Sequence, residues 1–365
     1  MKKLVTAAAA GVVASSPAWA GGFERSGVPL GFMFESGSYA ELSYGYASPT
    51  VEGSAGGGLA PTGDVAKNYS TLGIAFKTDL NEKISLGFTI DPSFGADVAY
   101  PNPSPGPYPI AGTNATLNGD TVALIGRYKL NDNFSVHAGL RSVGIGGNAT
   151  VVSSLGTYSA SYANDRSLGY LVGAAYEKPE IAMRIALTYA SETKHDMATT
   201  VAGVGFVGTE EVELPKSLTL DAQSGIAANT LLFGSIRWVD WTSTRLNSIG
   251  YPPEFQPLVG HDNDTITYTL GVGRKFSDTW SGAISIGYED SKGGIATNLA
   301  PTDGFWSVGV GGTYTRGNMK ISGGVRYVDI GDANALESPP GSGISNASFR
   351  GNSALGVGLK IGFTF

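Results

Sequence analysis

The chain has 365 residues, a formal net charge of −7 and no cysteine. The acidic balance argues against a nucleic-acid partner, because binding to phosphates needs a basic face. The lack of cysteine excludes disulfides and thiolate metal sites.

The first twenty residues have the three parts of a secretory signal. Lys2 and Lys3 precede an apolar run over residues 4–14, and the triplet Ala18-Trp19-Ala20 follows. The apolar run is too short to span a bilayer. We therefore expect a signal peptide over residues 1–20, cleaved after Ala20. No later stretch is apolar for about eighteen residues, so we expect no transmembrane helix.

From residue 39 to Phe365 the sequence repeatedly alternates large apolar residues with small or polar ones. The final run, residues 354–365, is typical. Such alternation predicts strands with one apolar and one polar face. Because the pattern recurs along the chain after an export signal, we expect an all-β fold over residues 39–365. It would be a transmembrane antiparallel β-barrel in the outer membrane of a Gram-negative bacterium, with its apolar face toward lipid.

Turn signals set the number of strands. Six short polar turns alternate with seven longer connections, which predicts about fourteen strands with both ends of the barrel on the short-turn side. The short turns are 79–82, 130–133, 178–180, 225–229, 277–278 and 317–318. The longer connections are 52–66, 91–115, 149–157, 194–209, 247–263, 291–303 and 331–347.

The strand predicted from Trp280 shows which face meets lipid. Trp280, Ile284 and Tyr288 fall on the apolar face, so an aromatic residue sits at each end of an apolar band. Aromatic bands at both membrane interfaces are typical of lipid-facing strands. A soluble β-sandwich needs no such bands.

The opposite, inward face carries more cations than carboxylates. Two interpretations remain open: the cations stitch neighbouring strands together, or they receive an anionic head group such as a carboxylate. The candidate ligand-binding cations are Arg127, Arg141, Arg184, Arg237 and Arg326.

The third predicted strand is interrupted at Asp91, Pro92 and Phe94. Pro92 has no N–H to give to a ladder, so we expect a kink there, and a gap through which an apolar solute leaves sideways into lipid. The following connection is rich in proline and aromatic residues. Its Tyr100, Tyr108 and Ile110 predict an outer apolar landing surface, although a stiff loop without a role is an equal alternative.

Several motifs in the C-terminal half resemble the outer-membrane long-chain fatty-acid transporter (FadL-like) family, which includes channels for aromatic hydrocarbons. The motifs are Leu214-Pro215, Trp238-Val239-Asp240-Trp241, Phe276 to Trp280, Gly287 to Ser291, Asp303 to Gly309, and the closing Gly362 to Phe365. The resemblance is good over residues 214–365 and weaker, but collinear, from about residue 67.

This resemblance implies a fourteen-strand barrel, an N-terminal plug and uptake of hydrophobic molecules. In the family, the ligand leaves through a gap near a kink in the third strand. Only residues 21–38 precede the first predicted strand here, and they lack the family's Asn-Pro-Ala element. We therefore expect a short plug-like segment, with Phe23, Phe32 and Phe34 as lining and gating candidates.

The function expected from these features is passive uptake of hydrophobic molecules, most of all long-chain fatty acids, by a monomer in contact with outer-membrane lipids. Fatty acids or hydrocarbons are the expected partners, with no cofactor and no metal. The alternatives are a general diffusion porin and a structural barrel. An enzyme is not expected, because His137 lies near Ser135 with no third group in sight.

Overall fold

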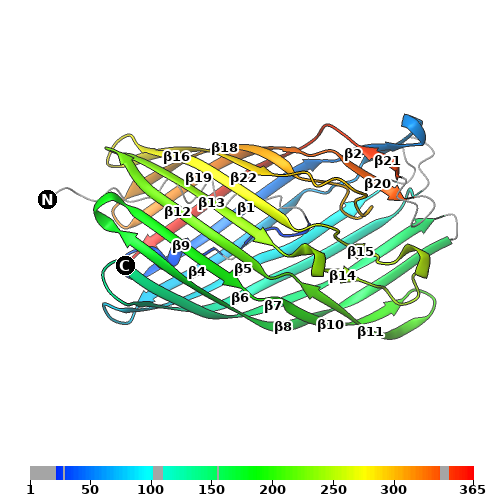
Figure 1. Ribbon diagram of the computed structural model, residues 1–365, viewed down its shortest axis with the longest axis horizontal. Helices are drawn as coiled ribbons and strands as arrows, with labels where there is room; N and C mark the ends of the chain where they lie inside the picture. Colours follow the sequence, from blue (N-terminus) through cyan, green and yellow to red (C-terminus); the bar gives the residue numbers. More distant parts are fainter. Residues whose placement is uncertain (1–21, 28, 102–109, 154–155, 338–344) are drawn as a thin grey trace.

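The computed structural model describes residues 22–27, 29–101, 110–153, 156–337 and 345–365, so the predicted signal peptide lies outside the described residues. The chain forms a long, closed barrel (Figure 1). Over the described ranges, no helix has the length and apolar character that a membrane crossing requires.

The wall is a 14-strand antiparallel barrel, as the turn signals predict. Each wall strand pairs with its neighbours in the chain, and β1 closes the circle by pairing with β22. Two wall strands are each built of two consecutive pieces, β9 with β10 and β11 with β12. The wall consists of β1 (Tyr39–Thr50), β4 (Tyr69–Asp79), β5 (Ile84–Ala99), β6 (Asn114–Lys129), β7 (Phe134–Ser153), β8 (Gly156–Lys178), β9 (Met183–Ala190), β10 (Thr193–Val201), β11 (Gly205–Leu214), β12 (Ser217–Ala227), β13 (Thr230–Val239), β16 (Thr265–Lys275), β17 (Trp280–Glu289), β18 (Phe305–Arg316), β19 (Met319–Ile330) and β22 (Asn352–Thr364).

The two faces of the wall follow the predicted alternation. On β17, Trp280, Ile284 and Tyr288 are exposed, whereas Ser285 and Glu289 are buried. Aromatic pairs lie at both ends of the exposed apolar band. Trp280 packs beside Tyr314 at one end, and Trp306 packs beside Tyr327 at the other. Because lipid must meet the apolar face, this arrangement places the band in the membrane.

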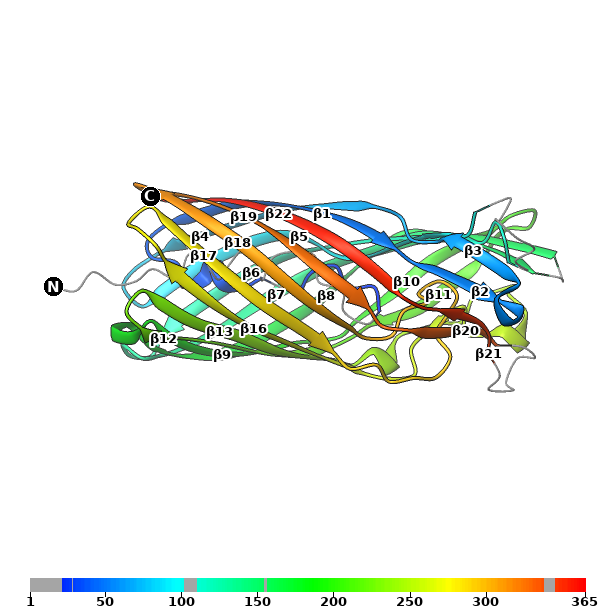
Figure 2. The ribbon, with the colours of Figure 1, turned by 90° about the horizontal axis from the view of Figure 1, so that it is seen from above.

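The six tight turns and the C-terminus lie at one end of the barrel, and the longer connections lie at the other (Figure 1). At the second end, β20 (Ala333–Glu337), β21 (Ser345–Phe349), β2 (Glu52–Ala55) and β3 (Ala60–Asp64) form a small four-stranded sheet (Figure 2). A two-stranded sheet of β14 (Arg245–Leu246) and β15 (Val259–Gly260), and the short 3-10 helices η2 (Gly56–Gly58), η4 (Trp241–Ser243) and η5 (Pro253–Phe255), complete this end, while η3 (Pro179–Ile181) belongs to a tight turn.

Two of the predicted long connections are wrong. Residues 149–157 and 194–209 are mostly strand, because β7 and β8 reach Ser153 and Gly156, and β10 and β11 are separated by only three residues. The outward residues there include Lys194, Asp196 and Glu211, which are polar because this part of the wall projects into water beyond the membrane. Polar outward residues on a strand were misread as loop.

The orientation of the wall predicts a depth-dependent cost for charge. Ile284→Arg places a cation midway between the interfacial Trp280 and Tyr288 and should destabilise the barrel by about 2–4 kcal/mol, whereas Phe276→Arg at the interface should cost about 0–1 kcal/mol. Reversible urea unfolding in lipid vesicles measures both values. Equal costs would contradict the placement of the membrane.

Candidate functional site

The wall is incomplete between the second and third strands. Pairing of β4 with β5 extends from Asp79↔Ser85 to Ile74↔Ile90 and stops there. Beyond Ile90, β5 carries a register shift between Asp91 and Phe94 on its other side, toward β6. Pro92 lies within this irregularity and has no N–H to donate, which accounts for the broken ladder. Within the described part of the chain, the wall therefore lacks a backbone ladder at this level, where the sequence predicts a kink.

An N-terminal segment lies inside the barrel against this irregular stretch. Glu24 forms a β-bridge with Phe94. The N–H of Arg25 donates to the carbonyl of Ser93 at 2.8 Å, and the N–H of Gly95 donates to the carbonyl of Phe23 at 2.8 Å. Backbone groups of β5 that β4 leaves unpaired thus find partners in residues 23–25.

A charged clasp fixes the same segment to the opposite wall. The guanidinium of Arg237 on β13 donates to both carboxylate oxygens of Glu24, at 3.0 Å from Nε and 2.5 Å from Nη2. Its Nη1 donates to Thr219 Oγ1 at 2.6 Å. Glu24 is buried, and a bidentate carboxylate–guanidinium pair in such surroundings is strong and directional.

On the side of the clasp toward the long connections, the segment contacts an aromatic cluster formed by Phe23, Phe94, Trp241 and His261. The Phe23 ring lies 4.9 Å from Trp241 and 6.3 Å from Phe94 between ring centroids. His261, in the loop after β15, lies 5.0 Å from Trp241. Burial lowers the pKa of His261 to about 4, so its ring is neutral at pH 7. The cluster is an uncharged aromatic surface.

A small cavity of about 80 Å³ lies beside the incomplete wall, lined by residues that include Phe23, Arg25, Tyr69, Asp97 and Val98. The Arg25 guanidinium lies 4.2 Å over the Tyr69 ring. Its buried Nε has no hydrogen-bond partner among the residues described. A carboxylate entering the cavity would satisfy this donor. The lining also includes Glu24 and Asp97, so the cavity joins an apolar wall to charged groups of both signs.

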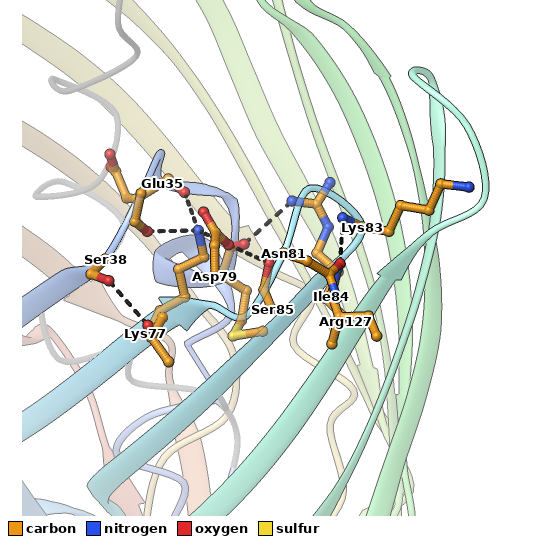
Figure 3. Close-up of polar contacts among 12 residues, drawn as sticks. Glu35, Ser38, Lys77, Asp79, Asn81, Lys83, Ile84, Ser85 and Arg127 are labelled. Carbon is orange, nitrogen blue, oxygen red and sulfur yellow. Dashed lines mark hydrogen bonds and ion pairs between the residues drawn. The ribbon is translucent and has the colours of Figure 1, made fainter.

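Toward the tight-turn end of the barrel, the 3-10 helix η1 (Gly31–Phe34) lies in the lumen. Phe32 and Met33 are buried against a cluster that includes Ala123 and Leu171. The end of the segment is tied to the wall, since Lys77 Nζ donates to the carbonyls of Glu35 and Gly37 at 2.8 Å each (Figure 3). Lys320 also pairs with the Glu35 carboxylate at 2.8 Å. Residues 23–27 and 29–37 therefore lie inside the barrel and occupy part of its lumen.

The predicted lumen cations all lie on the inner side of the wall, where they contact the N-terminal segment or other groups of the wall. Arg127 pairs with Glu177, and both Arg127 and Arg184 lie 4.4 Å from the Phe34 ring centroid. Arg141 donates to the carbonyl of Ser191 at 2.7 Å. Arg237 belongs to the clasp, and Arg326 is buried on β19.

The predicted outer landing surface needs correction. Tyr100 and Ile110 are buried in a cluster with Val51, Phe305 and Phe349, and Tyr108 lies outside the described residues. The Tyr100 hydroxyl also donates to the carbonyl of Asn298 at 2.8 Å. These two side chains pack in the interior of the outer end, because the small sheet of β2, β3, β20 and β21 covers them. They are therefore not available as a landing surface.

Four residues of the site escaped the sequence analysis: Glu24, Arg25, Trp241 and His261. Glu24 and Arg25 are adjacent charges in a segment whose one other charged residue is Glu35, and that was a usable signal. Trp241 and His261 lie in connections, where alternation assigns no face. In the part of the chain described, no group of three or more His, Asp or Glu side chains could hold a metal ion.

The described residues thus form a closed barrel with an N-terminal segment inside it and an incomplete seam between β4 and β5. A family model described as outer membrane protein transport protein (OMPP1/FadL/TodX) matches residues 3–365. The chain belongs to this family. Its members are outer-membrane transport channels for hydrophobic compounds, not enzymes. No curated protein matches the chain.

Solved structures share the fold at low sequence identity. A Pseudomonas aeruginosa FadL homologue is 14% identical with a TM-score of 0.71, and the match covers 92% of each chain. The Ralstonia pickettii toluene transporter TbuX is 14% identical with a TM-score of 0.63 over 97% of this chain and 98% of its own. The P. putida toluene transporter TodX is 12% identical with a TM-score of 0.66 over 91% of each chain.

The Glu24–Arg237 clasp predicts a leak when it is broken. Glu24→Ala leaves Arg237 without its carboxylate, and losing one partner of a buried pair costs about 3–5 kcal/mol. We expect the segment to detach and ion conductance in planar bilayers to rise well above that of the unchanged protein. Glu41→Ala is the control, because Glu41 pairs with Lys360 within the wall, at 3.5 Å. Equal conductance in the two variants would contradict the role of the clasp.

Proposed function

We propose that the protein is a channel for passive uptake of hydrophobic molecules, with long-chain fatty acids as its main cargo, acting as a monomer. The observation that carries the proposal is that a cavity next to the incomplete β4–β5 seam combines apolar lining residues with Arg25, whose Nε has no partner among the described residues, although Glu24 and Asp97 also border it. The candidate gate residues Phe23, Phe32 and Phe34 belong to the segment that fills the lumen.

The N-terminal segment inside the lumen distinguishes this proposal from a general porin. The cavity of about 80 Å³ is well below the roughly 300–1,000 Å³ of ordinary ligand pockets. A cargo molecule must therefore displace part of the N-terminal segment, residues 23–27 and 29–37. Binding energy from the apolar cargo would offset the loss of the plug's own contacts. A porin keeps a water-filled passage open and needs no such exchange.

The route out is sideways. A ligand at the cavity faces the stretch of β4 from residue 69 to 73, which β5 leaves unpaired. The outer side of the neighbouring wall is apolar, with Leu72 and Ile74 exposed to lipid. An apolar molecule loses nothing by passing from the cavity into hydrocarbon, whereas release into water would expose its whole surface. The gradient alone drives this transfer.

A carboxylate cargo and a hydrocarbon cargo place different demands on Arg25. Arg25→Met keeps the apolar stem but loses the charge, so binding of oleate should weaken roughly tenfold or more, as expected when a charged hydrogen bond of about 1.5–3 kcal/mol is lost. Toluene binding should not change. Equilibrium binding of both ligands to the purified protein measures the difference.

Lys67→Met is the control for that experiment, because Lys67 also borders the cavity but is exposed. Unchanged oleate binding in Arg25→Met, with toluene bound by every variant, would identify a hydrocarbon channel instead. The aromatic cluster of Phe23, Phe94 and Trp241 favours this second candidate.

The lateral route predicts an effect at Pro92. Pro92→Ala restores a backbone N–H, which favours ladder formation and narrows the seam. Uptake of oleate by cells should fall several-fold at equal protein level. Pro49→Ala on β1 is the matched control, since Pro49 lies in a continuous ladder opposite Ala354. Normal uptake by Pro92→Ala would rule out exit at this seam.

A further inference from the structure

A second weak seam lies on another side of the barrel, between β8 and β10. The ladder of β8 with β9 ends at Leu171↔Ala190, and only Ala160, Ser161 and Tyr162 pair with β10. Between these ends, the described strands are joined mainly through side chains. The Asp165 carboxylate accepts from the N–H of Asp196 at 3.3 Å and lies 3.4 Å from His195 Nδ1.

Two facing breaks mark the base of the hairpin formed by β10 and β11. One break is Ser191-Glu192, between β9 and β10, and the other is Pro215-Lys216, between β11 and β12. They lie side by side, because Thr193 pairs with Leu214 just above them and Ala190 pairs with Ser217 just below. Paired breaks at one level, with a proline in one of them, form a hinge line across the hairpin.

The far edge of the hairpin is also unpaired. β11 is the last strand in the hydrogen-bonded order of the described sheet. A buried polar latch replaces a strand there. The Glu210 carboxylate accepts from the Ser248 hydroxyl at 3.2 Å and from the N–H of Ile249. Ser248 in turn lies 2.6 Å from the Tyr162 hydroxyl on β8. A small side-chain network therefore holds the hairpin shut.

The inner face of the hairpin covers the route to the lumen. Met197, Val212 and Leu214 are buried in the cluster that contains Phe23 and Trp241. At its tip, Val204 and Phe206 are 72% and 67% exposed. Exposed apolar residues in water beyond the membrane attract apolar molecules. The hairpin thus presents apolar residues outside and covers the apolar cluster inside.

We propose that the β10–β11 hairpin is a hinged outer gate that admits apolar cargo to the lumen between β8 and β10. The inference rests on the proposed function and adds an entrance that is separate from the β4–β5 exit. Opening breaks the Glu210 latch, the few β8–β10 contacts and the packing of Met197, Val212 and Leu214 on the apolar cluster. It leaves the ladder between β10 and β11 intact. Motion at a few terminal residues of packed elements is the usual form of a hinge.

A reversible engineered disulfide tests the gate. The chain has no native cysteine, so no other thiol can compete for the pairing. Ser161 and Thr200 are directly opposite on β8 and β10, so S161C/T200C can form a disulfide that fixes the hairpin. Oleate uptake by the oxidised variant should be at least about tenfold slower than after reduction with dithiothreitol. T150C/S159C is the matched control, because it joins β7 to β8 at a similar height and its native hydroxyls lie 3.0 Å apart.

If oxidised S161C/T200C takes up oleate as fast as the same variant after reduction with dithiothreitol, the gate is overturned. An equal loss of uptake in oxidised T150C/S159C would also overturn it. A second measurement needs no cargo. Met197→Cys should react with a membrane-impermeant maleimide about tenfold faster in the Glu210→Ala background, because the latch is open. The rate at Ala283→Cys on β17 should stay the same in both backgrounds.

An unchanged rate at Met197→Cys would overturn the gate without reference to transport. A third outcome is that neither the unchanged protein nor any variant takes up oleate, while Met197→Cys still reacts faster in the Glu210→Ala background. In that case the proposed fatty-acid function fails and the gate stands. Heat-modifiable mobility in SDS gels, the difference in migration between unheated and heated samples, shows whether each variant contains a folded barrel.

Discussion

The structure depends on how the unpaired backbone of β5 is satisfied. In a membrane, each backbone N–H and C=O that lacks a partner costs several kcal/mol, and no water is present to supply one. Pro92 removes the ladder with β4, and the N-terminal segment supplies hydrogen bonds from inside the barrel. One interruption in one strand therefore accounts for the position of residues 23–25 inside the barrel and for the incomplete β4–β5 seam.

The inner cations fit the same account. Arg237 and Lys320 bind carboxylates of the plug segment, Lys77 binds its backbone, and Arg127 and Arg184 lie over Phe34. The two interpretations of these residues, wall support and ligand binding, are thus joined by a third, plug anchoring. A plug held by polar contacts at several separate points can be released in part while the rest stays bound. Arg25 differs from these cations because it belongs to the plug itself and borders the cavity.

The sequence predicted the features that depend on alternation and on single residues. The strand faces on β17, the tight turns and the irregularity at Pro92 follow from local rules of the pleat and of proline. The extended hairpins at the outer end were missed because outward residues above the membrane are polar, as loops are. The Glu24–Arg237 clasp could not be predicted from the sequence. Alternation places Arg237 on the inner face but does not tell which distant residue contacts it. Tyr100 and Ile110 were misjudged because composition does not reveal what covers a loop.

Mass spectrometry of protein extracted from the outer membrane in mild detergent, combined with its conductance in planar bilayers, tests the central claim most directly. The account predicts a co-purifying fatty acid or other apolar molecule and a low resting conductance, because the lumen is blocked by a segment that only such a ligand displaces. A protein that carries no small molecule and conducts ions freely would contradict the account and identify an open porin.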